Sequence, residues 1–249
     1  MRVAALYDIH GNLPALEAVL ESIRTAGVDL IVVGGDVLPG PMSVETLACL
    51  LNLRTPVRFI QGNGEVAVLA ELAGTDTSTL REQAREAVRW TAQQLQPEHE
   101  RAVASWSKTL QVEIHGLGEV LFCHATPRNE NEIFTRVTPE EQLLPIFEGL
   151  EIPVVVCGHT HMRFDRMVGK TRVVNAGSVG MPFGEPGADW LLLGPEIRPQ
   201  HTIYDFRRAA ERIRGTKYPQ AESFAACNIL QPPTEEEMLK VFARAEIRG

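Results

Sequence analysis

The chain has 249 residues, of which 44% are hydrophobic and 22% are charged. This composition is ordinary for a globular protein, and the length is sufficient for one sizeable core. The formal net charge of −8 excludes a broad electrostatic grip on the backbone of DNA or RNA, so we expect no extended nucleic-acid binding.

The cysteines and the apolar segments bear on the compartment. No two of the four cysteines form a Cys-x-x-Cys pair, so we expect reduced thiols and a cytoplasmic protein. No stretch approaches the ~20 apolar residues of a membrane helix. Asp8 and His10 interrupt the first apolar run at once, so we expect neither a membrane span nor a signal peptide.

The first part of the chain alternates strands with helices. Apolar runs predict strands at residues 3–7, 30–33 and 57–60. The segments between them predict helices at residues 13–26 and, after Ser43, at 44–51. This order predicts a parallel sheet with helices on its faces.

Residues 66 to about 108 form a predicted helical insertion. Helical spacing extends from Leu80 to Leu95, and a shorter helix is expected from Glu98 to Trp106 after the break at Pro97. The insertion follows directly on the loop that holds Asn63. We expect it to be either a cap over a neighbouring pocket or a helical layer that only packs.

Strand patterns return after the insertion. Further strands are predicted at residues 111–114, 119–123, 153–157, 163–167, 171–175 and 190–193. Thr138 opens a predicted helix with a capping box. Helices at 205–214 and 234–247 form a C-terminal tail, the second with Thr234 and Glu237 as its capping box. We expect a single domain over residues 1–249, with the insertion at about 66–108 and the tail at about 205–249.

Seven side chains of metal-binding type stand within a few residues of the end of a predicted strand. They are Asp8, His10, Asp36, Asn63, His124, His159 and His161. In open α/β sheets, ligands bind in the crevice beyond the carboxyl ends of the strands, so five strand ends can gather these donors in one pocket.

The donor set indicates a class of metal. Three carboxylate or amide oxygens with four imidazoles suit Mn, Fe, Zn, Ni or Co better than Ca, which prefers oxygen ligands alone. Seven donors are too many for one tetrahedral site, so we expect two divalent metal ions that share a bridging carboxylate.

Five short segments, in order, carry a family resemblance. They are Asp8-Ile9-His10, Gly35-Asp36, Gly62-Asn63, His124 and Gly158-His159-Thr160-His161. With these segments, the chain resembles the calcineurin-like metallophosphoesterases over roughly residues 1–180, and its opening resembles small bacterial phosphodiesterases of that superfamily. The resemblance implies an α/β fold in which a double β-sheet sandwich is flanked by helices.

The resemblance also implies a role for each donor. One metal would be held by Asp8, His10 and His161. The second would be held by Asn63, His124 and His159, and Asp36 would bridge both. A hydroxide between the two metals, with manganese favoured, would attack phosphorus, which makes Asp36 and Asn63 the catalytic candidates.

One position departs from the family pattern. The family usually has Asn-His-Asp or Asn-His-Glu where this chain has Asn63-Gly64-Glu65. The missing histidine normally helps to protonate the leaving group, and such help is worth about 10²–10⁴-fold in rate. The sequence therefore predicts low activity on poor leaving groups, and predicts that Gly64→His would raise monoesterase activity. The role of Glu65 is left open.

Two further residues are candidates for binding substrate. Asn12 stands at the start of a predicted helix, where it serves either as an anion contact or as a simple N-cap. Arg128 follows His124 closely and either reaches a phosphate or remains a solvated loop arginine.

These features predict a metal-dependent phosphoester hydrolase whose substrate is a small phosphoester or nucleotide, with a phosphodiester favoured. The alternatives are a phosphomonoesterase or nucleotidase, and a dinucleoside polyphosphate hydrolase. A metal-binding scaffold without turnover is the alternative outside the enzymes. The physiological substrate and the oligomeric state are not predicted by the sequence.

Overall fold

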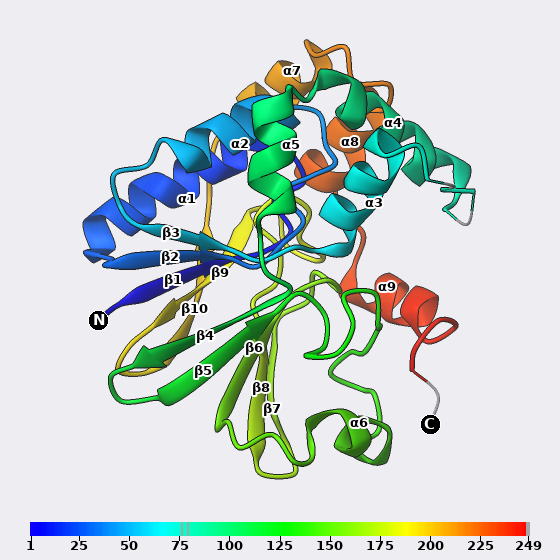
Figure 1. Cartoon of the computed structure of the whole chain (residues 1–249). Coiled ribbons are helices and arrows are strands. Elements are labelled where there is room, and N and C mark those ends of the chain that lie inside the picture. The colour runs from blue at the N-terminus through cyan, green and yellow to red at the C-terminus, as the bar shows by residue number, and fades with distance from the viewer. Residues whose placement is uncertain (76, 79, 248–249) are drawn as a thin grey trace.

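Two five-stranded β-sheets pack face to face in the computed structural model, which describes residues 1–75, 77–78 and 80–247 (Figure 1). The strand orders are β10-β9-β1-β2-β3 and β4-β5-β6-β8-β7. Helices flank both sheets, which confirms the predicted α/β sandwich. Positions 76, 79, 248 and 249, which fall within the expected insertion and tail, lie outside the described residues.

The first sheet has a parallel centre and an antiparallel edge. Strands β1 (Val3–Leu6), β2 (Leu30–Val33) and β3 (Val57–Phe59) are parallel, as predicted. Strand β9 (Ala188–Leu193) pairs antiparallel with β1, so the sheet is mixed. Strand β10 (Ile197–Thr202) was not predicted, because its Pro, Gln and His residues break the strand pattern. Proline is tolerated on an edge strand, where β10 lies.

The second sheet places β5, β6 and β8 parallel to one another. Its strands are β4 (Thr109–Ile114), β5 (Gly118–Cys123), β6 (Val154–Cys157), β7 (Phe164–Val168) and β8 (Thr171–Asn175). The predicted strands and hairpin in this region are confirmed within one or two residues.

The core between the sheets is built from alternate residues of facing strands. Val3, Ala5 and Tyr7 of the first sheet are fully buried in one cluster with Phe122 and Val156 of the second. The Tyr7 hydroxyl donates a hydrogen bond of 2.9 Å to the carbonyl oxygen of Val156. This packing aligns the carboxyl ends of β1 and β6 and therefore brings their following loops together.

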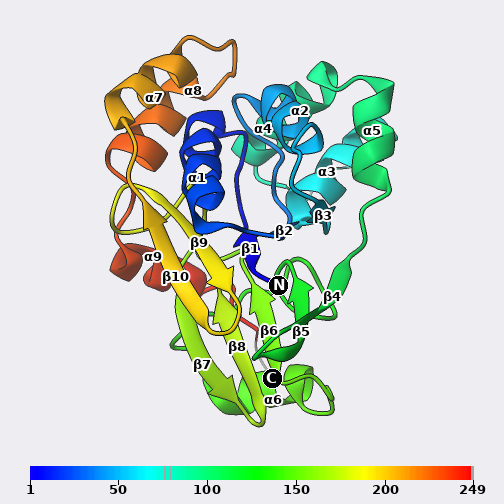
Figure 2. The same cartoon turned by 90° about the vertical axis from the view of Figure 1, so that its left-hand side faces the viewer.

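Helices cover the outer face of each sheet (Figures 1 and 2). The first sheet is covered by α1 (Leu13–Ala26) and α2 (Ser43–Leu51), and α7 (Phe206–Arg214) packs against α1. Beside α7, α8 (Ala221–Phe224) leads into a π-helical segment at Ala225–Leu230, neither of which was predicted. The second sheet is covered by α6 (Glu140–Phe147), whose Leu143 and Phe147 pack on the buried Val155.

The helical insertion is part of the core. Helix α3 (Asn63–Leu72) begins at Asn63 itself, three residues before the expected start, and is followed by α4 (Glu82–Gln94) and α5 (Pro97–Ala104). Val68 and Val88 are buried in the same apolar cluster as Leu16 of α1 and Leu6 of β1. Removing the insertion would therefore expose the core.

Two helix termini test the predicted capping boxes. The box at Thr138 is wrong: α6 begins at Glu140, and the Thr138 hydroxyl instead accepts a hydrogen bond from the Thr135 amide and donates one to Glu246. The box of Thr234 and Glu237 is confirmed, but helix α9 (Glu235–Phe242) ends five residues before the expected Ile247.

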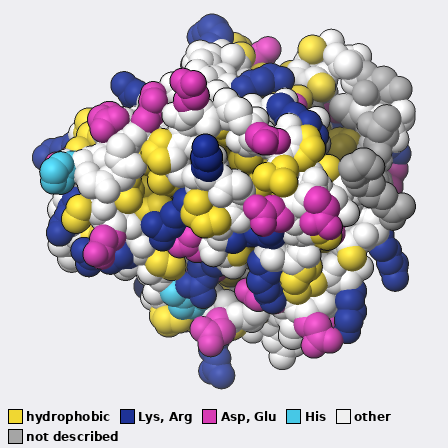
Figure 3. Space-filling model, turned by 90° about the horizontal axis from the view of Figure 1, so that it is seen from below, with side chains coloured by type: hydrophobic (Ala, Val, Ile, Leu, Met, Phe, Trp, Pro, Cys, Tyr) yellow, Lys and Arg dark blue, Asp and Glu magenta, His cyan; other side chains and the backbone are white. Residues whose placement is uncertain are grey.

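The face in Figure 3 carries charges of both signs. On the face shown in Figure 3, acidic and basic side chains alternate, without a broad basic area among the described residues. All four cysteines are free thiols. Within residues 1–75, 77–78 and 80–247, no helix is both long and apolar enough to cross a membrane.

Candidate metal centre

The predicted donors meet where five strand ends converge. Asp8 and His10 follow β1, Asp36 follows β2, and Asn63 follows β3. His124 follows β5, and His159 and His161 follow β6. The first sheet therefore contributes four of these seven residues and the second sheet three, so the site lies across the sandwich.

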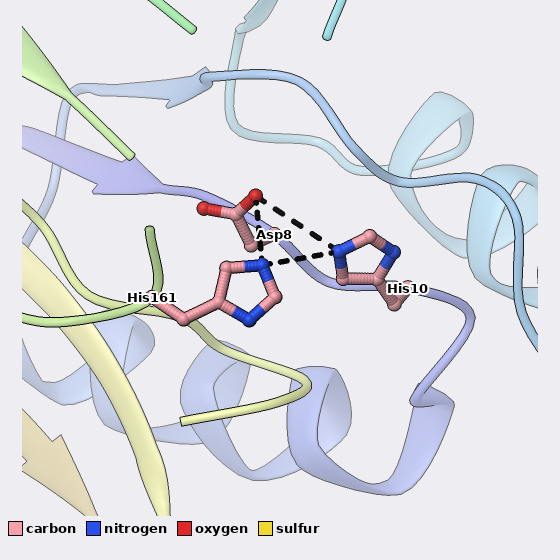
Figure 4. Close-up of side chains that lie close together, drawn as sticks. All are labelled: Asp8, His10 and His161. Atoms are coloured by element: carbon pink, nitrogen blue, oxygen red, sulfur yellow. Dashed lines mark hydrogen bonds and ion pairs between the residues drawn. The ribbon is translucent and has the colours of Figure 1, made fainter. Parts of the chain in front are cut away.

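Asp8, His10 and His161 form one compact group (Figure 4). The Oδ1 atom of Asp8 lies 3.3 Å from Nε2 of His161 and 3.9 Å from Nε2 of His10. The two Nε2 atoms are 3.3 Å apart. These three donors are those that the family resemblance assigns to the first metal.

Asp36 lies between this group and His124. Its Oδ2 atom is 3.6 Å from Nε2 of His10, and its Oδ1 atom is 3.5 Å from Nε2 of His124. Each carboxylate oxygen of Asp36 thus faces a histidine that the family resemblance assigns to a different metal. Asp8 also contacts both sides, because its Oδ1 atom is 3.8 Å from Nε2 of His124. The family resemblance implied a place for Asp8 at one metal only, whereas Asp8, Asp36 and His124 form a second compact group here.

Asn63 and His159 stand beside His124. The Oδ1 atom of Asn63 is 3.0 Å from Nε2 of His124, so the amide oxygen faces the cluster. The ring centroids of His124 and His159 are 5.1 Å apart. The backbone N–H of His159 donates to Oδ2 of Asp8 over 2.8 Å, which ties the loop after β6 to that after β1.

Three histidines are oriented by backbone carbonyl groups. The Nδ1 atom of His124 lies 2.9 Å from the carbonyl oxygen of Gly34. The Nδ1 atom of His161 lies 2.9 Å from that of Met181, and the Nδ1 atom of His10 lies 3.3 Å from that of Pro39. A carbonyl oxygen only accepts, so Nδ1 carries the hydrogen in each ring. Each Nε2 atom is then directed at the cluster, which is the usual arrangement of a metal-binding histidine.

The backbone at the site adopts a sparsely populated conformation. Among the described residues, five non-glycine residues have a positive φ: Asp8 (53°), His10 (48°), Asp36 (53°), His159 (67°) and His161 (56°). All five are predicted metal ligands. Such conformations cost of order 1–3 kcal/mol each and cluster at functional sites, where the surrounding structure holds them. The backbone therefore singles out the same residues as the side-chain chemistry.

Burial and the two carboxylates shift the pKa values of the four histidines in opposite directions. Burial lowers the pKa of His10, and it lowers that of His159 to about 4, so both imidazoles are neutral and available as ligands. Burial opposes protonation of His124 and His161 as well, but the nearby carboxylates of Asp8 and Asp36 outweigh it and raise the pKa of both.

One buried atom identifies what fits the site. Asp8 is fully buried, and its Oδ1 atom has no hydrogen-bond partner among the described residues. Burial raises the pKa of this carboxyl, yet the neighbouring histidines, His161 first, hold it below its ordinary value. An ionised, unpaired carboxylate oxygen is costly in a protein interior. Divalent cations surrounded by these nitrogens and oxygens would satisfy it, so the residues fit the metal ions that the donor set implies.

Glu65 joins two of the ligand-bearing loops. It is fully buried, and its carboxylate accepts hydrogen bonds from the backbone N–H groups of Asp36 (2.8 Å), Leu38 (2.9 Å) and Gly62 (2.8 Å). Burial and the charge of Asp36 raise its pKa to about 7, against these three bonds. A Glu in the first turn of a helix is the sequence signal for the bond to Gly62. The other two bonds depend on the tertiary structure, and so the sequence left this residue without a role.

We expect Glu65→Gln to weaken metal binding. The Gln NH₂ group would face a backbone N–H, and one buried donor would lose its partner at a cost of about 1–3 kcal/mol. Loss of such an outer contact typically lowers metal affinity roughly 10–100-fold. Mn²⁺ titration calorimetry and thermal unfolding measure both effects, with the exposed Glu151→Gln as control. Unchanged Mn²⁺ affinity in the Glu65 variant would exclude this positioning role.

Gly64 is held against the loop after β2. Its N–H donates to Oδ1 of Asp36 over 2.7 Å. A Cβ atom at this position would overlap the carbonyl oxygen of Leu38 and would lie 3.0 Å from Oδ1 of Asp36. The place where a side chain would begin is therefore occupied by backbone.

The two substrate-binding candidates have partners within the protein. Asn12 is fully buried, its Oδ1 atom accepts from the N–H of Ala15, and its Nδ2 atom donates to the carbonyl of Gly180. Asn12 is thus an N-cap of α1, as its alternative reading predicted. Arg128 is half exposed and pairs with Glu132 at 2.6 Å. Phosphate contacts by either residue remain predictions.

A comparison with protein families decides the classification. The model of the calcineurin-like phosphoesterase superfamily domain matches residues 1–194. The chain belongs to this superfamily. The matched region contains all seven donors, both sheets up to β9 and the helical insertion.

Three proteins that are similar to the chain match it over most of its length. The chain is 25% identical over 240 residues to the uncharacterized protein MJ0912 of Methanocaldococcus jannaschii, covering 88% of this chain and 94% of that one. A metallophosphoesterase from Sphaerobacter thermophilus is 25% identical, with a TM-score of 0.69 over 92% of this chain and 100% of that chain. The hypothetical protein PH1004 from Pyrococcus horikoshii shares the fold at 21% identity, with a TM-score of 0.77 over 94% and 99% of the two chains.

Proposed function

We propose that this phosphoesterase hydrolyses small phosphodiesters with two divalent metal ions, manganese favoured. The observation that carries the proposal is the convergence of donors on Oδ1 of Asp8. This oxygen has no hydrogen-bond partner among the described residues, and it faces Nε2 atoms of three histidines within 3.9 Å. Asp36 places one oxygen toward each side of the group. A site of this kind suits two cations that share carboxylate ligands.

The residues would divide between the two metals as the family pattern implies. One metal would be held by Asp8, His10 and His161. The other would be held by Asn63, His124 and His159, with Asp36 shared. When bound, the metals would supply a water activated near neutral pH and positive charge for the phosphoryl oxygens.

The protein groups position the substrate and limit the leaving group. The Asn63 oxygen faces His124, which leaves its NH₂ free to donate to a phosphate oxygen. Gly64 provides no proton where the family has a histidine, so the leaving-group proton would come from water. Ester groups that leave as stable anions should therefore react fastest. The preference for diesters rests on the resemblance to small phosphodiesterases that share this loss.

A paired assay tests the proposal. Purified protein would be given bis-p-nitrophenyl phosphate or p-nitrophenyl phosphate with added Mn²⁺, with and without chelator. We expect chelator-sensitive turnover that favours the diester. Turnover that favours the monoester would replace the proposal with a phosphatase or nucleotidase. Absence of turnover, in protein shown to contain metal, would favour a dinucleoside polyphosphate hydrolase or a scaffold.

The cytoplasm remains the expected compartment, because all four cysteines are free.

A further inference from the structure

A cavity of about 340 Å³ opens directly from the metal centre. His10, Asp36 and Asn63 form its inner end, and it continues between helices α3 and α4 of the insertion. A group joined to a phosphate at the metals would therefore enter this cavity without crossing bulk solvent.

The walls of this cavity are apolar. Six side chains from α3, α4 and the segment between them line it: Val66, Ala67, Ala70, Leu80, Ala84 and Val88. All except Val88 are partly or fully exposed, so their surfaces are available to a ligand. Burying an apolar group against such a wall contributes roughly 25 cal/mol per Å² of surface removed from water.

The charges of the lining limit what the cavity accepts. Thr77 and Asn131 are its polar residues away from the metal end, and no Lys or Arg belongs to the described lining. A second phosphate or a carboxylate would meet no cation there, although anionic groups are normally bound by Arg or Lys. The lining therefore disfavours a polyphosphate chain and favours a neutral group.

The size of the cavity sets an upper limit as well. Pockets for whole drug-sized ligands are about 300–1,000 Å³, so this one is near the lower end. Its inner end would also hold part of the phosphate. The space that remains fits a single ring or a short alkyl chain.

We propose that this cavity binds the apolar ester group of the substrate, so that the substrate class is phosphoesters of apolar aryl or alkyl alcohols. The inference deepens the proposed function and rests on it. The insertion then acts as the specificity-determining wall of the metal site, with Ala70 and Ala84 as the residues whose small size keeps the cavity open.

Binding of non-hydrolysable phosphonates to the Mn²⁺-loaded full chain tests this inference without turnover. The probes are methylphosphonate, butylphosphonate and 3-hydroxypropylphosphonate, measured by calorimetry. We expect butylphosphonate to bind roughly 10- to 60-fold tighter than methylphosphonate, because three extra methylenes are buried. The hydroxyl of 3-hydroxypropylphosphonate should remove most of this gain, since it would lose water without a matched partner.

Two variants fill the cavity, and one matched variant does not. Ala70→Leu and Ala84→Leu should lower the preference for butylphosphonate by about tenfold, because the added side chain takes the space of the alkyl group. Ala73→Leu makes the same change at an exposed residue outside the lining, and should leave the preference unchanged. Thermal unfolding verifies that each variant is folded, and Ala84, on the exposed side of α4, is the safer site.

The outcomes separate the inference from the proposed function. Equal affinity for the methyl and butyl probes, or no binding of either, in protein that hydrolyses bis-p-nitrophenyl phosphate overturns the inference and leaves the function standing. A chain-length preference that Ala70→Leu and Ala84→Leu both retain also overturns it. The protein could also prefer butylphosphonate, lose that preference in both variants and yet show no turnover. This result would support binding of apolar groups in the cavity and would overturn the proposed hydrolysis.

Discussion

Asp36→Asn is expected to remove metal from both sets of ligands and to lower kcat/KM by roughly three orders of magnitude or more. The reason is the position of its two oxygens, 3.5 Å from Nε2 of His124 and 3.6 Å from Nε2 of His10. An amide retains only one of these oxygens and lacks the negative charge. One group of donors would therefore lose an oxygen ligand, and both groups would lose the negative charge of the carboxylate that they share.

This variant should remain folded. Asp36 has a φ of 53°, and Asn is among the residues that tolerate this left-handed conformation best. Metal content after dialysis, thermal unfolding and diesterase rate would be measured together. Asp165→Asn, which alters an exposed carboxylate paired with Arg172, serves as the control. Full activity of Asp36→Asn, with two metals still bound, would disprove the shared-ligand assignment.

Gly64→Ala is expected to destabilise the protein and to disturb the metal centre. In most helices, replacing glycine by alanine is stabilising, by about 0.4–1 kcal/mol. Here the added Cβ would overlap the carbonyl oxygen of Leu38 and lie 3.0 Å from Oδ1 of Asp36. Overpacking of this kind costs roughly 1–3 kcal/mol, and the loop that holds Asp36 would have to move.

Thermal unfolding and Mn²⁺ affinity measure this effect. We expect Tm to fall by roughly 2–12 °C, because 1 kcal/mol corresponds to about 2–4 °C in a chain of this size. Gly215→Ala is the matched control, because Gly215 has a φ of −73° and a Cβ there would meet its neighbours at an ordinary 3.4 Å. If Gly64→Ala were as stable as the natural chain, the loop after β2 would be able to move away from the added Cβ at little cost in free energy.

The same contact revises an expectation drawn from the sequence. Gly64→His was predicted to raise monoesterase activity by restoring a lost acid. Any side chain at this position begins with the Cβ that overlaps Leu38, so we now expect Gly64→His to damage the site before it supplies a proton. The close approach of the loop makes the glycine a structural requirement here.

Elements with strong local patterns could be predicted. The strands before Asp8, Asp36 and Asn63 are short apolar runs, and their identity as parallel strands followed from the helices between them. Strand β10 and the helices at 221–230 could not be predicted, because they lack such patterns and are held by their neighbours. At Thr138, a contact with Glu246, distant in the chain, replaced the local cap.

From the sequence alone, the five ordered motifs implied the superfamily and its α/β sandwich through their resemblance to known members. The candidate donors could be named because each stands within a few residues of the end of a recognisable strand, and such ends gather at one edge. Only the tertiary structure decided how these donors meet. The sharing of Asp8 between two groups, the bonds of Glu65 to Asp36 and Leu38, and the overlap of Gly64 with Leu38 all join segments that are distant along the chain. The apolar cavity likewise exists because α3 and α4 pack beside Asp36. Local patterns carry no information on such distances, since they record only neighbours within a few residues along the chain.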